Sequence, residues 1–112
     1  MKAQDIAQLN ESAEEASQLL KSLSSPIRLK ILCQMVDGEC SVGEIAANIG
    51  IRDTLASQHL SLLRREGIVA TRREAQTIYY RVESAAAHRL LGVLHECYCG
   101  TTAAPAKRAR KP

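Results

Sequence analysis

The residues of this chain that can take part in the widest range of reactions are its four cysteines, Cys33, Cys40, Cys97 and Cys99. Cysteine thiolates act as nucleophiles, bind soft metal ions and form disulfides. The first residues lack the apolar core of a signal peptide, and no apolar run reaches the about 20 residues that span a bilayer. We therefore expect a cytoplasmic protein with no membrane contact, whose cysteines serve as thiols, redox sensors or metal ligands rather than as structural disulfides.

Two of the cysteines lie near the end of the last predicted helix, together with a histidine. His95 and Cys99 are four residues apart and share a helix face, whereas Cys97 is turned roughly 200° away from that face. Cys33 falls among the leucines of an earlier helix, where a cysteine alone would be a buried small hydrophobic residue. The chain contains no Cys-x-x-Cys and no catalytic constellation, so we do not expect an enzyme.

Residues 41–67 between these cysteines predict a helix-turn-helix. Ser41 and Glu44 form an S-x-x-E capping box, in which hydroxyl and carboxylate satisfy each other's backbone amides at the start of a helix. Gly50 ends that helix. A second helix runs over residues 53–66, and the glycine that follows it closes its end.

The second helix carries small polar side chains that are able to reach base edges or phosphates of DNA. On an isolated helix such residues would be an ordinary solvated face, but a preceding helix at a tight turn gives this one the geometry to dock in a groove. His59 either contacts a phosphate or buttresses the two helices. The expected DNA contacts of this helix are Thr54, Ser57, Gln58 and His59.

Residues 68–74 and 77–82 are β-rich runs on either side of a short polar turn, which predicts a hairpin. Positive charge gathers here, because residues 52–81 carry six arginines against three acidic residues. A polyanion would bind there. We expect Arg72, Arg73 and Gln76 to contact phosphates or the minor groove, the alternative being solvated hairpin charges.

Helices flank these central elements on both sides. Apolar residues within 6–23 recur at alternating steps of three and four, which is typical of a helix that buries one stripe. A second helix is expected from Ser25, its cap, to Gly38, and a last one over residues 84–100. The pattern predicts a mainly α chain with a β-hairpin, a winged helix-turn-helix of five helices plus a two-stranded wing.

The length of 112 residues supports one domain. We expect a winged-helix DNA-binding domain over residues 1–99, with dimerisation helices at both ends, because the first and last helices carry more apolar surface than one such domain covers. Residues 100–112 end in KRARKP and show no periodicity. They are expected to form a disordered basic tail.

This order of elements resembles the ArsR/SmtB family of bacterial winged-helix repressors. The similarity is carried by the segments SPIRLKIL, SVGEIAANIG, SQHLSLLRREGIV and TRREAQTIYY, and it covers roughly residues 10–99. It implies a homodimer that binds a pseudo-palindromic operator of double-stranded DNA.

Within this family, the ILC segment of the second helix and the pair Tyr98-Cys99 are similar to the persulfide-sensing branch of BigR-like and HlyU-like proteins. This similarity implies Cys33 and Cys99 as the sensing pair, with Cys97 as the substitute for Cys99. It implies reactive sulfur species or thiol oxidation as the effector, and no cofactor. The expected function is a repressor whose operator affinity is switched at this pair.

A metal- or arsenic-responsive repressor of the same family is the main alternative. The Cys-x-Cys of such sensors would fall at Ser41 and Gly43, and the last helix lacks the acidic-x-His start of the zinc-sensing type, so we expect no metal site. The alternative that remains open is a different thiolate site, for example for As(III), with Cys40, Cys97, Cys99 and His95 as its ligands. A winged-helix interaction module that does not bind DNA is less favoured, because the hairpin is basic.

Overall fold

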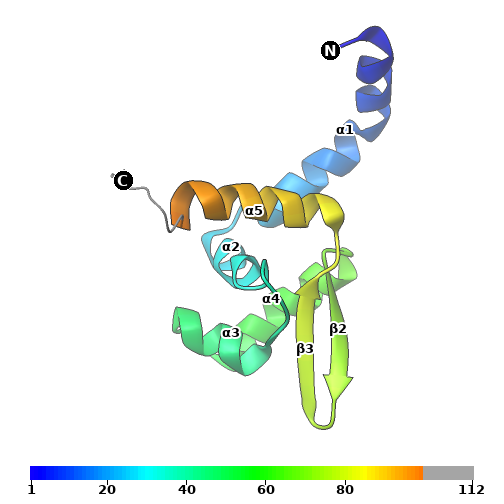
Figure 1. Ribbon diagram of the computed structural model, residues 1–112. Coiled ribbons are helices and arrows are strands. Elements are labelled where there is room, and N and C mark those ends of the chain that lie inside the picture. The colour runs from blue at the N-terminus through cyan, green and yellow to red at the C-terminus, as the bar shows by residue number, and fades with distance from the viewer. Residues whose placement is uncertain (100–112) are drawn as a thin grey trace.

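The structure is a computed structural model that describes residues 1–99, so the expected basic tail 100–112 lies outside the described residues. Within that range, five helices and three short strands follow one another, and Figure 1 shows their arrangement. The elements are α1 (Ala3–Leu23), α2 (Pro26–Cys33), β1 (Cys40–Ser41), α3 (Val42–Ile49), α4 (Asp53–Arg65), β2 (Val69–Glu74), β3 (Thr77–Val82) and α5 (Ala85–Cys99).

Helix α2 begins as the sequence predicts and ends earlier. Ser25 caps it by accepting a hydrogen bond from the Arg28 amide at 3.3 Å, and Pro26 occupies the first turn, where its missing N–H costs nothing. The helix was expected to continue to Gly38, but it ends at Cys33. The next amides bond three residues back instead of four, with Val36 N donating to Cys33 O at 3.3 Å, so the chain tightens into a turn over residues 34–39.

The helix-turn-helix forms where its capping signals predict it. The Ser41 amide donates to the Glu44 carboxylate at 2.9 Å and the Glu44 amide donates to the Ser41 hydroxyl at 3.2 Å, which closes the capping box of α3. Gly50 ends α3 with a φ of +71°, a left-handed conformation that favours glycine. Helix α4 starts three residues later without a side-chain cap from Arg52.

The predicted two-stranded wing is confirmed, and a third short strand joins it to form a three-stranded sheet. Strands β2 and β3 pair antiparallel from Val69 opposite Val82 to Glu74 opposite Thr77, and Ala75 turns the chain with a φ of +56°. The two-residue strand β1 adds to the other edge of β3, which gives the order β1-β3-β2. Such a short strand has no alternation that a sequence could show.

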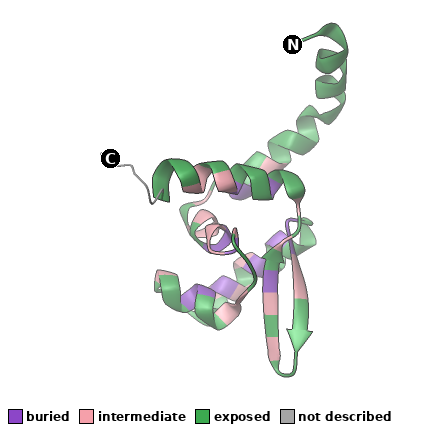
Figure 2. Cartoon of the chain, in the orientation of Figure 1, coloured by how far each residue is buried: buried purple, intermediate pink, exposed green. Residues whose placement is uncertain are grey.

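The core lies between α2, α3, α4, the base of the wing and the inner face of α5, as the buried segments in Figure 2 show. Its largest fully buried side chains come from every one of those helices, and they are Ile31, Leu32, Met35, Ile45, Leu60, Leu63 and Leu91. Burying apolar side chains of this size stabilises the fold by roughly 1.5–3 kcal/mol each. The core therefore fixes α4 and the wing to a single scaffold centred on α2.

Helix α1 contributes little to this core. Only Ser22 and Leu23 at its end are buried, and its N-terminal half stands clear of the rest in Figure 1. Its apolar stripe is consequently open, with Ile6, Leu9 and Leu20 exposed by 46%, 44% and 56%. Among residues 1–99 no helix is long and apolar enough to cross a membrane.

Candidate functional site

Helix α4 presents a polar face because its apolar residues are anchored on the opposite side. Ala56, Leu60 and Leu63 are fully buried, so the helix is fixed in rotation. Thr54 and Gln58 are exposed and Ser57 is half-buried at the edge of that face. The structure therefore brings these three predicted contact residues onto the outer side of the second helix of the helix-turn-helix.

A shallow hollow of about 480 Å³ on this face extends the predicted contact set. Ser57 and Gln58 line it together with Ser61, Leu62 and Arg65. Ser61 is one of the small polar side chains of this helix that the sequence suggested could reach DNA, whereas Arg65 was not among the predicted contacts. The spacing of Arg65 gives the signal that identifies it, because residues 57, 61 and 65 are four apart and so share one face of a helix.

His59 lies at the contact between α2 and α4. Its Nδ1 accepts a hydrogen bond from Arg28 Nε at 3.3 Å, and the Arg28 Nη1 also donates to the Ser22 carbonyl at 3.4 Å and lies 4.0 Å from Glu66 Oε1. Burial and the neighbouring Arg28 cation both lower the pKa of His59. The lowered pKa favours the neutral imidazole, and the hydrogen bond from Arg28 joins α4 to α2.

The wing places its polar side chains in different surroundings. Arg73 and Gln76 are exposed near the turn, and no carboxylate within residues 1–99 pairs with Arg73. Arg72, which points to the other face of β2, is paired with Glu39 and Glu74. All three predicted wing contacts are exposed, and of the three Arg72 is paired with carboxylates.

The structure places Cys33 and Cys99 at the ends of two helices that pack on each other, α2 and α5. Cys33 is half-buried and Cys99 is exposed, and both are free thiols. Burial raises the pKa of the Cys33 thiol, and the negative charge of the nearby Cys99 thiolate raises it further. Cys97 is exposed on α5 as well.

Cys40 occupies a separate place on β1, beside the wing. Its Sγ donates to the Gln34 carbonyl at 3.5 Å, and burial followed by the charge of Glu44 raises the pKa of its thiol. Among residues 1–99 no group of three or more His, Cys, Asp or Glu side chains is placed to hold a metal ion. The four-residue thiolate site considered from the sequence is therefore not assembled within one described chain.

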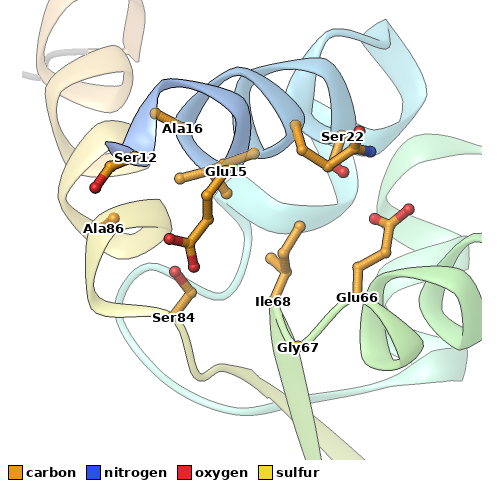
Figure 3. A pocket seen from close by; sticks show the side chains of 11 residues that line it. Ser12, Glu15, Ala16, Ser22, Glu66, Gly67, Ile68, Ser84 and Ala86 are labelled. Atoms are coloured by element: carbon orange, nitrogen blue, oxygen red, sulfur yellow. The ribbon is translucent and has the colours of Figure 1, made fainter. Parts of the chain in front are cut away.

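A groove of about 590 Å³ separates α1 from the start of α5 and the turn between α4 and β2. Figure 3 shows Glu15 pointing from α1 toward Ser84, with Ile68 and Glu66 on the opposite wall. None of the predicted contact residues or cysteines lines this groove. The groove shows that α1 packs loosely on the rest of its own chain.

Fold and surface together define a winged helix-turn-helix protein with a polar outer face on its second helix, which is the form of a protein that docks in the major groove of DNA. A family model described as bacterial regulatory protein, arsR family, matches residues 25–71. The chain belongs to the ArsR family and is a DNA-binding transcriptional regulator similar to HlyU and BigR. This confirms the predicted family and fold class, and the regulator family agrees with the expectation that the chain is not an enzyme.

The similarity extends over most of the chain. The transcriptional activator HlyU of Vibrio cholerae is 38% identical over 95 residues, which are 85% of this chain and 88% of that protein. A biofilm growth-associated repressor of Xylella fastidiosa is 44% identical over 91 residues, 81% and 80% of the two chains.

Solved structures of these two relatives have the same fold. Reduced HlyU from Vibrio cholerae has a TM-score of 0.78 at 39% identity and covers 82% of this chain and 97% of its own. The repressor BigR from Xylella fastidiosa has a TM-score of 0.76 at 42% identity, with coverage of 88% and 98%.

Proposed function

We propose that this chain is a homodimeric repressor that leaves its double-stranded DNA operator when reactive sulfur or thiol oxidation links Cys33 to Cys99. The observation that carries the proposal is the placement of the two thiols. They lie at the ends of packed helices, near enough for the charge of one to act on the other. A link there joins the scaffold of the helix-turn-helix to the last helix of the domain.

A hydropersulfide, RSSH, supplies the oxidising power for this link. The Cys33 thiolate attacks the outer sulfur, the S–S bond breaks, RSH leaves and Cys33 carries a persulfide. The Cys99 thiolate then attacks the inner sulfur of that persulfide and expels H₂S, so the two thiols lose two electrons and two protons. If both thiols carry a persulfide, loss of H₂S leaves a trisulfide. Peroxide gives the disulfide with water as the product.

The dimer is supported by the apolar surface that one chain leaves open. Besides the stripe of α1, the outer side of α5 exposes Leu90, Val93 and Tyr98 by 37%, 56% and 82%. Several large apolar side chains exposed on two helices favour an interface, and a two-fold dimer would place two α4 helices about one DNA turn apart. Helices α1 and α5 at the two ends of the domain are therefore the proposed dimerisation elements.

The direction of regulation depends on the role of the bound protein. The relative from Xylella fastidiosa is named a repressor, whereas the relative from Vibrio cholerae is named an activator. A bridge that lowers operator affinity would raise transcription for a repressor and lower it for an activator. We propose the repressor role, as in the name of the Xylella fastidiosa relative.

Intact mass after treatment identifies the effector. Reduced protein is exposed separately to a hydropersulfide, hydrogen peroxide, arsenite and zinc, and the bridged peptides are mapped. The proposal expects loss of two hydrogens, or gain of sulfur with that loss, in a peptide pair containing Cys33 and Cys99. A response to arsenite or zinc alone would replace it with the metal-responsive alternative.

Four single variants assign the pair. Binding is measured on a duplex selected from a random-sequence pool by wild-type protein. Cys33→Ser and Cys99→Ser are expected to bind this duplex and to ignore persulfide, whereas Cys40→Ser still responds. Cys97→Ser is the matched control for the second thiol. If it abolishes the response while Cys99→Ser keeps it, the bridge uses Cys97.

A further inference from the structure

Arg72 of the wing is bonded through all three of its guanidinium nitrogens. Its Nε donates to both Glu39 carboxylate oxygens at 3.1 Å, its Nη2 donates to Glu39 Oε1 at 2.9 Å, and its Nη1 donates to Glu74 Oε1 at 2.8 Å. The guanidinium carbon also lies 5.0 Å from the centre of the Tyr79 ring. These bonds use three of the five guanidinium N–H groups, so Arg72 is bound mainly to carboxylates and keeps one unused N–H on each of Nη1 and Nη2.

The charge of this cluster also opposes a phosphate contact. Two carboxylates surround one guanidinium, so the group as a whole is negative. The hydrogen bond from Arg72 lowers the pKa of Glu39, because the guanidinium stabilises the ionised carboxylate. Releasing Arg72 to DNA would leave two unpaired carboxylates beside the phosphate backbone.

Glu39 belongs to the loop 34–39, and other elements hold this loop in place. The Gln34 amide donates to the Ile45 carbonyl of α3 at 3.3 Å, and Asn48 donates to the Gln34 side-chain oxygen at 2.9 Å. His88 Nε2 of α5 lies 2.9 Å from the Val36 carbonyl. The carboxylate that binds Arg72 is therefore fixed to the body of the domain, from which the tip of the wing projects in Figure 1.

Arg73 has the opposite surroundings on the same strand. Successive side chains of a strand point to opposite faces, so Arg73 faces away from Glu39. It is exposed, and no carboxylate pairs with it in residues 1–99. Of the two adjacent arginines, Arg72 is bound to carboxylates and Arg73 has no ion-pair partner among residues 1–99.

We propose that Arg72 is a positioning residue: its bond to Glu39 reinforces the pairing of β1 with β3 in fixing the angle of the wing against the helix-turn-helix, and Arg73 supplies the cation that meets a DNA phosphate. The proposal rests on the DNA binding of the family and does not depend on the cysteine bridge. It revises the role expected for Arg72, since the same arginine was selected from the sequence as a contact.

Glu39→Gln distinguishes a DNA contact from a positioning role of Arg72, because the two roles predict opposite changes in DNA affinity. If Arg72 contacted DNA, the substitution would free a guanidinium and remove a negative charge, and affinity for the selected duplex would rise. If Arg72 positions the wing, affinity falls several-fold. The slope of log K against log salt stays unchanged, because the loosened wing still reaches the duplex in the complex and Arg73 keeps its phosphate contact, so the loss of affinity is the cost of ordering the wing. Unchanged or increased affinity of Glu39→Gln overturns the proposal.

The two arginine variants complete the test. Arg72→Gln is expected to match the loss of Glu39→Gln with an unchanged salt slope, and the double variant is expected to lose no more than either single one. Arg73→Gln is expected to reduce the salt slope by about 1. A salt slope that falls by about 1 in Arg72→Gln assigns the phosphate contact to Arg72 and contradicts the proposal.

A matched control changes the same charge elsewhere on the wing. Glu83 pairs with Arg81 at 3.2 Å near the base of β3, and Glu83→Gln removes one carboxylate without touching the bonds of Arg72. Its affinity is expected to stay equal or rise slightly. Hydrogen–deuterium exchange over residues 70–81 provides a readout without DNA: it is expected to quicken in Glu39→Gln and not in Glu83→Gln. Equal exchange in both contradicts the positioning role.

Discussion

The reactivity of a single thiol sets how the proposed switch responds. Sulfur chemistry proceeds through the thiolate, yet burial and the charge of Cys99 both raise the pKa of Cys33. At neutral pH Cys33 is therefore mostly protonated, and its reaction rate continues to rise as the pH passes the value of about 8.5 that is usual for a free cysteine. A sensor of this kind reacts slowly with weak oxidants.

The influence of Cys99 on Cys33 can be measured directly. Cys99→Ser removes one of the two causes of the raised pKa, so the pH profile for alkylation of Cys33 by iodoacetamide is expected to move to lower pH. Peptide mass spectrometry follows Cys33 alone. Cys97→Ser is the control and is expected to leave the profile in place. Equal shifts in the two variants would show that Cys99 is not the specific neighbour of Cys33.

The outer face of α4 and the wing are expected to contribute differently to DNA binding. Gln58 is placed to reach a base edge, so Gln58→Ala is expected to cost about 1–3 kcal/mol on the selected duplex and little on random DNA. Arg73→Ala weakens binding to every sequence alike, because a phosphate carries no sequence information. Fluorescence anisotropy on both duplexes over a range of salt concentrations measures the difference. Equal losses of Gln58→Ala on the two duplexes would remove Gln58 from the base-reading set.

At the scale of the elements, the contact between α2 and α4 depends on a neutral histidine. Arg28 donates to His59 Nδ1 only while that nitrogen is unprotonated. The pKa of His59 is lower in the folded chain than in the unfolded one. Its contribution to the free energy of unfolding is therefore complete above about pH 6.5 and is lost as the pH falls through the lowered value.

The lowered pKa of His59 predicts how the free energy of unfolding changes with pH. Between about pH 7.5 and about pH 5, wild type is expected to lose more free energy of unfolding than His59→Gln, in which the titrating group is absent. Urea unfolding at the two pH values measures it. His95→Gln, which leaves the contact with Arg28 intact, is expected to keep the contribution of His59. Parallel losses in wild type and His59→Gln would contradict the assignment.

The elements show which parts of the fold a sequence can predict. Helices α3 and α4 were predicted closely because their start and stop signals are local, as in the pairing of Ser41 with Glu44. The end of α2 was missed because Gln34 is held by partners on α3, far along the chain. Strand β1 was missed because two residues carry no pattern. Arg72 was selected for its charge, and its partner Glu39 lies 33 residues away, where no spacing rule links them.

The proposed repressor binds its operator as a dimer of two chains. Leu20 is 56% exposed on α1 in the single chain, so Leu20→Glu is expected to leave the domain folded and to prevent dimerisation. Ala7→Glu adds the same charge to an exposed position roughly 140° around that helix and serves as the control. Analytical ultracentrifugation and binding to the selected duplex are the measurements. Wild type that stays monomeric at micromolar concentration would contradict the dimer.

The central claim is that a bridge between Cys33 and Cys99, distant from the DNA-binding face, changes the affinity for DNA. Such a coupling arises when the bridged conformation fits the operator less well than the reduced one. The most direct measurement is the dissociation constant of one protein preparation on the selected duplex in three states: reduced, bridged by persulfide, and reduced again. We expect the affinity for the duplex to fall about 5- to 150-fold on bridging, which is a coupling of about 1–3 kcal/mol. The affinity is expected to return on reduction. Equal affinities in the three states, with the Cys33–Cys99 bridge demonstrated by mass, would contradict the central claim.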